Sequence, residues 1–419
     1  MIAALRDKYN ASFKETKYQQ MKADLEKDFP NAIEFRLAET PIFIDAATKQ
    51  KLLKAGDEIC SFITSADFAA QTEQSFQHVL TPPNEAALPE CIVMDFAICN
   101  DETNTIVPKL IELQGFPSLF GFEYLHDKAF RQNFEIPLGY SPYLNGYNEK
   151  LYLSHLRNII KGDQNKHTVL LELYPHEQKT KIDFYITQQL LDIPIVCLSE
   201  IFVVASELFY KREGIDYKIE RIYNRIIWDE LIKQSEALQA KGKLLLEKLN
   251  VEWVTHPNHF YRISKFTIPY FTSNAVPHTQ FLSDIKVMPD DLENYVLKPL
   301  FSFAGQGVII DITPADIAAI KNLENSNPTF FQQPIEDISQ LFLDIKKSIP
   351  KSLKTNGILA RVKVSETLAR KLHEIYNVED TDLIESEQTK IDLIESHANL
   401  LFQINKTREK EAQRIIKPI

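Results

Sequence analysis

Glycine is scarce in this chain of 419 residues, which contains 11, and cysteine is scarcer, with four. Cys60, Cys91, Cys99 and Cys197 show no C-x-x-C spacing and lie mostly in apolar surroundings. The spacing therefore indicates neither a zinc site nor a disulfide framework. Reduced thiols inside a hydrophobic core are the expectation.

Long hydrophobic runs are also missing. No stretch reaches the roughly 18 apolar residues that a transmembrane helix needs. The N-terminal residues lack a basic segment followed by a continuous apolar run, as a secretory signal peptide would have. The sequence therefore predicts a cytoplasmic protein without a membrane span.

Positive charge is in deficit, because 47 Lys and Arg stand against 58 Asp and Glu and give a net charge of −11. Binding to nucleic acids or anionic membranes usually depends on clustered Lys and Arg, so neither partner is expected. A nucleotide pocket needs only local positive charge and remains open. Apolar residues are plentiful at 44%, which is ample for buried cores in a chain of this length.

The apolar spacing predicts a mixed α/β fold that is α+β in detail. It indicates an N-terminal α+β region, a small α/β domain, a short region around a lysine-bearing strand and a mainly helical C-terminal segment. These regions span residues 1–146, 147–285, 286–336 and 337–419.

Within these regions, the sequence predicts several elements that the structure can test. Strands are expected over 32–44, 91–99, 106–114, 168–173 and 194–198, with a hairpin over 200–220 that turns at Arg212-Glu213-Gly214. Helices are expected over 1–30, 46–80, 175–191 and 229–249, and around 338–345. The 168–198 stretch indicates a β-α-β unit with parallel strands.

A lysine and a loop of small residues lie between two short apolar runs at 295–311. The first run predicts a buried strand that ends in Lys298, and 308–312 predicts the strand that returns. Successive backbone N–H groups in such a loop can cradle phosphate oxygens, with the lysine as a nearby charge. A plain glycine hairpin is the alternative interpretation.

Two further polar groups interrupt apolar segments. Glu112 and Gln114 share one face at the end of the predicted hairpin, before a turn at Gly115, and a solvated face is the alternative. Arg221 and Arg225 emerge from an apolar segment. Guanidinium groups suit a bidentate grip on carboxylate or phosphate, although surface salt bridges explain many such pairs.

A third polar group mixes two histidines with aromatic residues over 252–265. Metal ligation by His256 and His259 would need a third ligand, and none lies nearby in the sequence. The sequence favours hydrogen-bonded loop histidines here.

Taken in this order, the segments resemble the ATP-grasp superfamily, specifically the carboxylate–amine ligases similar to glutathionylspermidine synthase. The resemblance covers about residues 30–336. It implies an ATP-grasp-like fold, with 147–285 as a pre-ATP-grasp domain and 286–336 as a partial nucleotide-binding region. The resemblance also implies contacts to ATP from Lys298, from the loop residues Ser302, Ala304, Gly305, Gln306 and Gly307, and from the hinge residues Gln332, Gln333 and Ile335.

The resemblance implies a chemistry as well. A carboxylate attacks the γ-phosphate of ATP to give an acyl phosphate, and an amine then opens this intermediate to an amide. Arg221, Arg225 and Glu112 would be the catalytic residues, with the arginines orienting the substrate carboxylate. ATP and Mg²⁺ are the implied cofactors, and the partners are a nucleotide and an unidentified small carboxylate and amine.

The segment after residue 336 departs from the family pattern. The strand-like run with Arg361 has no glutamate before it, and Gln403 stands where the family has an acid, beside Asn405. Asn405 is thus a weak candidate metal ligand without a carboxylate pair. Two explanations stay open: a non-catalytic nucleotide- or protein-binding relative that has lost its metal site, or a C-terminal segment outside the ancestral reading frame.

Overall fold

The computed structural model describes residues 2–76, 81–101, 103, 105–162, 166–302, 307–310, 312–318, 320 and 340–343. Helices and strands mix throughout this part of the chain, and the predicted α/β fold class is confirmed. The α-helices are α1 (Ala3–Ser12), α2 (Glu15–Asp28), α3 (Ala46–Ile63), α4 (Phe68–Thr72), α5 (Phe120–Asn133), α6 (Glu149–Lys161), α7 (Lys181–Leu191), α8 (Trp228–Leu231), α9 (Glu236–Leu244) and α10 (Pro257–Arg262).

The strands form four sheets, two of them with four strands each. They are β1 (Val93–Asn100), β2 (Ile106–Gln114), β3 (Thr168–Glu172), β4 (Ile195–Cys197), β5 (Ile201–Val204), β6 (Glu207–Arg212), β7 (Ile215–Ile219), β8 (Arg221–Asn224), β9 (Glu252–Val254), β10 (Thr279–Phe281), β11 (Val296–Pro299), β12 (Ile309–Ile310) and β13 (Gln340–Leu343).

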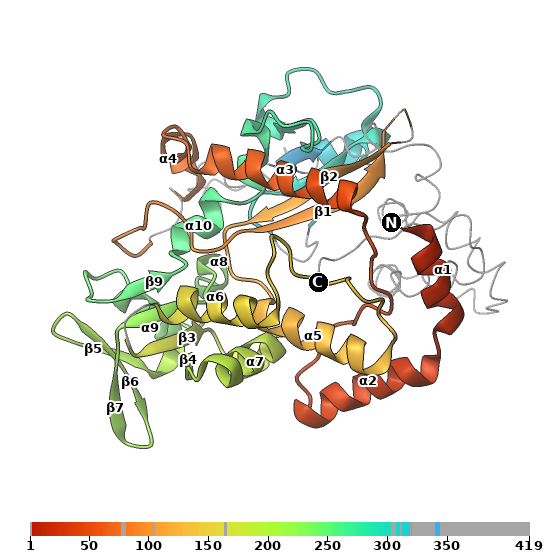
Figure 1. Cartoon of the computed structure of the whole chain (residues 1–419). Coiled ribbons are helices and arrows are strands. Elements are labelled where there is room, and N and C mark those ends of the chain that lie inside the picture. The colour runs from red at the N-terminus through yellow and green to blue at the C-terminus, as the bar shows by residue number, and fades with distance from the viewer. Residues whose placement is uncertain are drawn as a thin grey trace, which may run out of the picture.

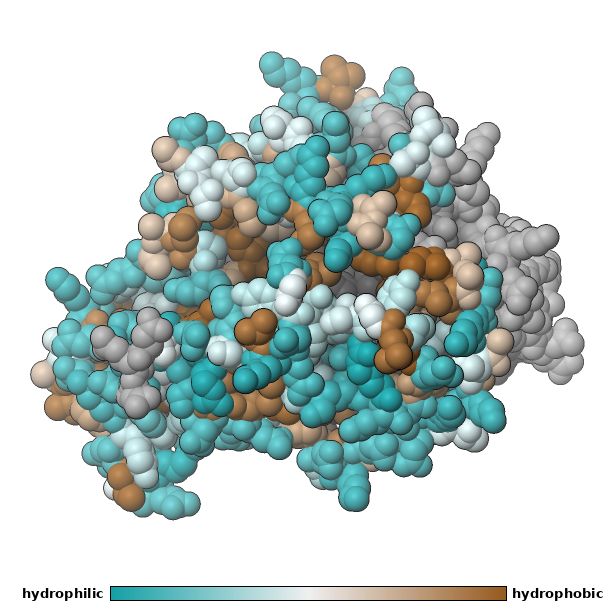
Figure 2. All heavy atoms as spheres, in the orientation of Figure 1, coloured by the Kyte–Doolittle hydropathy of each residue, from teal (hydrophilic) through white to brown (hydrophobic). Residues whose placement is uncertain are grey.

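The molecule has an upper and a lower part in the view of Figure 1. The upper part contains α3, α10 and the β1–β2 hairpin, and the lower part contains the parallel sheet with α5, α6 and α7. Figure 2 shows that this face is hollowed between the two parts, and that hydrophobic side chains gather in the hollow. Within the described residues, no helix combines the length and the apolar character that crossing a bilayer requires.

The N-terminal helices are confirmed, but the strand predicted over 32–44 is wrong. The chain there has no regular secondary structure, and its apolar side chains pack into the core that α1, α2 and α5 form, with Leu37 and Phe43 buried. The alternation that favoured a strand therefore reflects burial against helices. Pro41 also has no N–H to donate to a sheet.

The predicted β1–β2 hairpin is confirmed, with a register shift between Asp95 and Phe96. Asp95 lies opposite Glu112 in this antiparallel pair, so two carboxylates share a cross-strand position. Helix α3 covers the hairpin, and Ile59 and Ile63 pack with Leu110 in one core cluster. The predicted helix over 46–80 is shorter, because α3 ends at Ile63 and the separate α4 follows.

The predicted β-α-β unit is confirmed as β3, α7 and β4, with parallel strands in the order β4-β3-β8-β9. The turn at Arg212-Glu213-Gly214 joins β6 to β7, and β5 adds a further strand. The helix expected over 229–249 is divided into α8 and α9. Ser235 begins α9, since its hydroxyl accepts a bond from the Leu238 N–H at 3.4 Å.

The lysine-bearing strand and its return strand are also confirmed, as β11 and β12. They belong to an antiparallel sheet in the order β10-β13-β11-β12. The helix predicted around 338–345 is wrong for residues 340–343, which form β13 between β10 and β11. A short apolar run does not distinguish a helix from a buried strand by its spacing alone. The other predictions after residue 320 lie outside the described residues.

Candidate functional site

Four charged side chains meet where the end of β11 approaches the β1–β2 hairpin. We name Asp95, Glu112, Lys265 and Lys298 the lysine hub. The Lys265 Nζ donates to Glu112 Oε1 at 2.7 Å and also to the Ser302 carbonyl oxygen. The Lys298 Nζ donates to the carbonyl oxygen of Ile111 at 2.9 Å. The structure thus brings two of the predicted site residues, Glu112 and Lys298, into one cluster.

Both lysines of the hub are buried, since Lys265 is 4% exposed and Lys298 is 6% exposed. Burial, together with the neighbouring Lys265 charge, lowers the pKa of Lys298 to about 8. Glu112 and Asp95 act in the opposite direction. Within the hub, the two ammonium groups are balanced by the carboxylates of Glu112 and Asp95.

Gly115 permits this geometry at the end of β2. Its N–H donates to the Ile263 carbonyl at 2.7 Å, so the chain lies directly against the end of α10. A Cβ atom at Gly115 would lie 2.4 Å from the backbone oxygen of His259 and 2.6 Å from the Ile263 Cβ. Only glycine allows this close approach, which brings β2 beside the 3-10 helix η4 (Lys265–Tyr270) that carries Lys265.

The small-residue loop begins beside the hub. Ser302 follows β11, and its carbonyl oxygen is a Lys265 partner. Gly307 has a φ of +68°, and a Cβ there would lie 2.7 Å from the Pro299 Cγ. Several predicted ligand residues lie outside the described residues, and their roles stay predictions: Ala304, Gly305, Gln306, Gln332, Gln333, Ile335 and Asn405.

Arg225 lies just beyond the carboxyl end of β8, where ligands of parallel sheets commonly bind. Its Nη1 donates to the Pro117 carbonyl oxygen and, at 3.4 Å, to that of Ser118. Its guanidinium carbon is 5.3 Å from the ring centroid of Phe116 and 5.1 Å from that of Phe184. Arg225 is therefore held rigidly between the chain after β2 and helix α7.

Three buried polar atoms at this edge have no hydrogen-bond partner within the described part of the chain. They are Arg225 Nε, the Tyr223 hydroxyl and Asp183 Oδ2. The other Asp183 oxygen accepts from the N–H groups of Gly121 at 2.8 Å and Phe122 at 3.0 Å, at the start of α5. Unpaired buried polar groups are uncommon and call for a specific explanation, such as a bound ligand.

Buried carboxyl groups surround Arg225. Burial raises the pKa of Glu172 to about 8, and the Arg225 charge partly opposes this shift. Burial also raises the pKa of Asp183, again against the Arg225 charge. Glu123 has its pKa raised to about 8, first by burial and then by the charges of Asp183 and Asp95. Asp95 is among the charges that act on both Glu123 and Lys298.

Arg221 lies at the opposite end of β8 from Arg225. Its Nε and Nη2 donate to the carbonyl oxygens of Ile160 at 2.9 Å and Ile159 at 2.8 Å, at the end of α6. Its Nη1 donates to Glu252 Oε2 at 2.6 Å. The structure therefore gives Arg221 a place in helix termination and strand pairing, and it does not bring Arg221 to the other predicted site residues.

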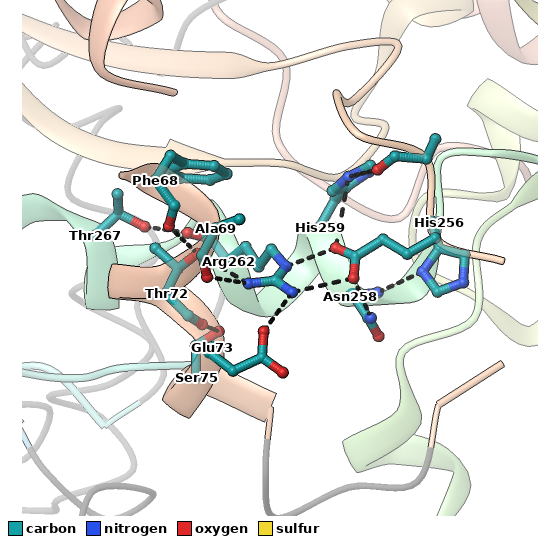
Figure 3. Close-up of polar contacts among 12 residues, drawn as sticks. Phe68, Ala69, Thr72, Glu73, Ser75, His256, Asn258, His259, Arg262 and Thr267 are labelled. Carbon is teal, nitrogen blue, oxygen red and sulfur yellow. Dashed lines mark hydrogen bonds and ion pairs between the residues drawn. The ribbon is translucent and has the colours of Figure 1, made fainter. Parts of the chain in front are cut away.

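The histidine-rich segment forms a buried ion-pair network around Arg262 (Figure 3). The Arg262 Nε donates to Glu85 Oε1 at 2.6 Å, and Nη2 donates to Glu73 Oε2 at 2.8 Å. Asn258 donates to the second Glu85 oxygen at 2.7 Å. The His259 Nε2 lies 3.1 Å from the Ala86 carbonyl oxygen. We name this network the Arg262 clamp, because it ties residues 69–73 and 85–86 to α10.

The predicted hydrogen bonds of the two histidines are confirmed, but the segment is a helix and not a loop, with His256 as the N-cap of α10 and His259 within it. The His256 Nδ1 accepts from the Asn258 N–H at 3.2 Å, and His259 contacts a backbone carbonyl. Over the described ranges, no group of three or more His, Cys, Asp or Glu side chains is placed to hold a metal ion.

Lys265 belongs to the hub, but the sequence did not single it out as a site residue. The sequence does carry one signal for it. Ser264 and Thr267 form a capping box, so Lys265 is the first residue of η4. A positive charge at a helix start is unfavourable, so a lysine there indicates a role outside the helix.

Comparisons with known proteins found a likeness in structure but none in sequence. No protein-family model matches it, and no curated protein matches it. Among solved structures, it is similar to the apo form of a glutathione synthetase-like effector from Globodera pallida. The two share 11% identity with a TM-score of 0.46, over 80% of this chain and 83% of that one. A likeness of this size supports no conclusion about residues or activity.

Proposed function

We propose that this protein binds ATP through the lysine hub, within an ATP-grasp-like framework for joining a carboxylate to an amine. The observation that carries this proposal is the pair of buried ammonium groups, Lys265 and Lys298, at the base of the small-residue loop. Their positions agree with the phosphate-binding role that the sequence resemblance implies for Lys298.

A polyphosphate suits the hub for electrostatic reasons. Burial makes the charged form of Lys298 unfavourable, and an adjacent anion with several oxygens would restore it. Lys265 already bonds a carboxylate and a carbonyl oxygen, so its third proton would be its contribution to an oxyanion. Glu112 fixes Lys265 in this position and acts as a positioning residue.

Arg225 is proposed to orient the carboxylate that becomes activated. Its Nε, the Tyr223 hydroxyl and Asp183 Oδ2 are among the buried polar atoms that have no hydrogen-bond partner in the described residues. In the proposed reaction, the substrate carboxylate attacks the γ-phosphorus of ATP, and ADP leaves. The amine then attacks the acyl carbon of the acyl phosphate, inorganic phosphate leaves, and the amine loses a proton to give the amide.

Mg²⁺ normally accompanies ATP in such chemistry. Since the described residues do not form a metal site, no step is assigned to the ion here. The alternative function is that of a non-catalytic protein, which binds ATP at the hub but does not join a carboxylate to an amine. The proposed reaction is that of the carboxylate–amine ligases similar to glutathionylspermidine synthase.

Calorimetric titration of ATP into the full chain tests the proposal. Lys298→Ala should weaken ATP binding by about 1.5–3 kcal/mol, the usual value of a hydrogen bond to a charged group. Lys286→Ala is the matched control, because Lys286 is exposed on the neighbouring segment and should bind ATP like the wild type. Absence of ATP heat in the wild type, or equal affinity in Lys298→Ala, would remove the nucleotide-binding claim.

A further inference from the structure

Strand β7 presents an open edge. It pairs with β6 on one side, and none of the strands in the described residues pairs with its other side. The opposite edge of this sheet differs, because α9 lies against β5 and the Lys241 Nζ donates to the Ile201 carbonyl at 2.6 Å. Figure 1 shows that the β6–β7 hairpin projects from the body of the molecule, so a second chain can reach the β7 edge.

The charged side chains along this edge are self-complementary, so the edge can pair with the same edge of a second copy. Asp216 and Lys218 lie on one face of β7, with Tyr217 between them on the other. Their side chains are 49% and 43% exposed. In an antiparallel pair of two β7 strands centred on Tyr217, Asp216 lies opposite Lys218 of the second copy, and the reverse pair forms by symmetry. The dimer would therefore contain two Asp216–Lys218 pairs between the copies.

The neighbouring strand extends the pattern. Lys211 on β6 lies opposite Asp216 and forms an ion pair with it at 3.2 Å. Pairing through β7 would therefore place Asp216 between two lysines, Lys211 of its own chain and Lys218 of the second copy. Alternating charges across strands stabilise a sheet, whereas like charges placed directly opposite destabilise it.

The other face of the edge carries apolar side chains. Ile215 is 55% exposed and Tyr217 is 37% exposed. Pairing centred on Tyr217 sets the two tyrosines against each other and brings the exposed Ile215 into register with Ile219 of the second copy, which is buried in its own chain. Figure 2 shows hydrophobic side chains at the tip of this hairpin within a mainly hydrophilic surface. Covering them removes apolar surface from water.

We propose that β7 is a self-association edge, through which two copies of this chain form an antiparallel six-stranded sheet from their β5-β6-β7 units. This inference is independent of the proposed nucleotide binding. A single strand pair buries little surface, so the dimer is a weak, reversible one that depends on protein concentration and salt.

A charge-exchange experiment on the full chain tests the register. Asp216→Lys puts lysine opposite Lys218 of the second copy, and Lys218→Asp puts aspartate opposite Asp216. Each variant alone should dimerise about tenfold more weakly than the wild type, since two attractive pairs become repulsive. A mixture of the two variants should form a heterodimer. One chain then carries lysine at positions 216 and 218, and the other carries aspartate at both positions. Sedimentation equilibrium over a concentration series measures all four cases.

The folding control is the melting temperature of each variant. The ion pairs that the changes break are exposed, so the effect on monomer stability is small. Recovery of the dimer in the mixture supports the proposed register even if one variant is somewhat destabilised. A monomeric wild type at every concentration, or a dimer that neither variant weakens, overturns the proposal.

Discussion

At the level of single residues, Lys298 is a buried ammonium group whose charge a bound anion would stabilise. Its ammonium group donates to the Ile111 carbonyl oxygen, and a second ammonium group lies nearby. Burial lowers its pKa to about 8, so the folded protein alone stabilises the charge poorly. An anion beside Lys265 and Lys298 would reverse this cost. Glu112 has Lys265 as its partner in this structure.

Glu172 gives a prediction about pH. Burial raises its pKa to about 8 from the ordinary value of 4.5, so the folded state binds more protons than the unfolded state between these values. The stability that comes from this group is therefore full below pH 4.5 and is lost as the pH rises to about 8. Glu172→Gln keeps an oxygen for the Leu173 N–H and removes the titration.

The variant should accordingly be more stable than the wild type at pH 8, by about 1–3 kcal/mol, and gain less at pH 5. Urea unfolding at the two pH values measures the difference. Glu213→Gln, on the turn between β6 and β7, serves as an exposed control. An equal effect of Glu172→Gln at both pH values would show that Glu172 ionises normally in the fold.

At the scale of elements, the Arg262 clamp gives a prediction about stability. Arg262 is 7% exposed and joins α10 to residues 69–73 and 85–86 through Glu85, Glu73 and the carbonyl of Ala69. Arg262→Ala removes the charged donor of the partly buried Glu85, while Glu73 is exposed to solvent, and should cost about 1.5–3 kcal/mol of unfolding free energy. Urea unfolding and limited proteolysis within 69–86 measure it.

Lys233→Ala is the control for this prediction, since Lys233 forms an exposed pair with Glu230 and should cost about 0–1 kcal/mol. Arg262→Lys should rescue only part of the loss, because an ammonium group does not present the planar set of donors that reaches two carboxylates. A cost for Arg262→Ala as small as that for Lys233→Ala would mean that the clamp does not hold the segment.

Elements with a clear hydrophobic period could be predicted from the sequence. The β1–β2 hairpin and the β3-α7-β4 unit have turn residues at their ends and apolar residues at the expected spacing. The strand expected over 32–44 failed because its alternating residues pack onto helices. The long helix expected over 229–249 failed because Ser235 caps a new helix within it. Tertiary packing and a local cap decided these two cases.

At the scale of the whole molecule, only part of the candidate site could be predicted. Glu112 and Lys298 are far apart in the sequence, and the order of motifs brought them into one proposal. The sequence did not show that Lys265 joins them, because this contact depends on the close approach at Gly115. Arg225 and Arg221 look alike in sequence, yet they lie at opposite ends of β8. Spacing alone does not reveal which strand end a side chain reaches.

The central claim is that Lys298 binds the phosphates of ATP, and proton linkage tests it most directly. Phosphate contact should return the pKa of Lys298 from about 8 toward 10.5. At pH 8, ATP itself is fully ionised, so the protein must take up about half a proton for each ATP bound. Calorimetry at pH 8 in buffers of different ionisation enthalpy measures this uptake. The account predicts an uptake that disappears in Lys298→Ala, and an ATP binding heat without proton uptake, or with the same uptake in the variant, would contradict it.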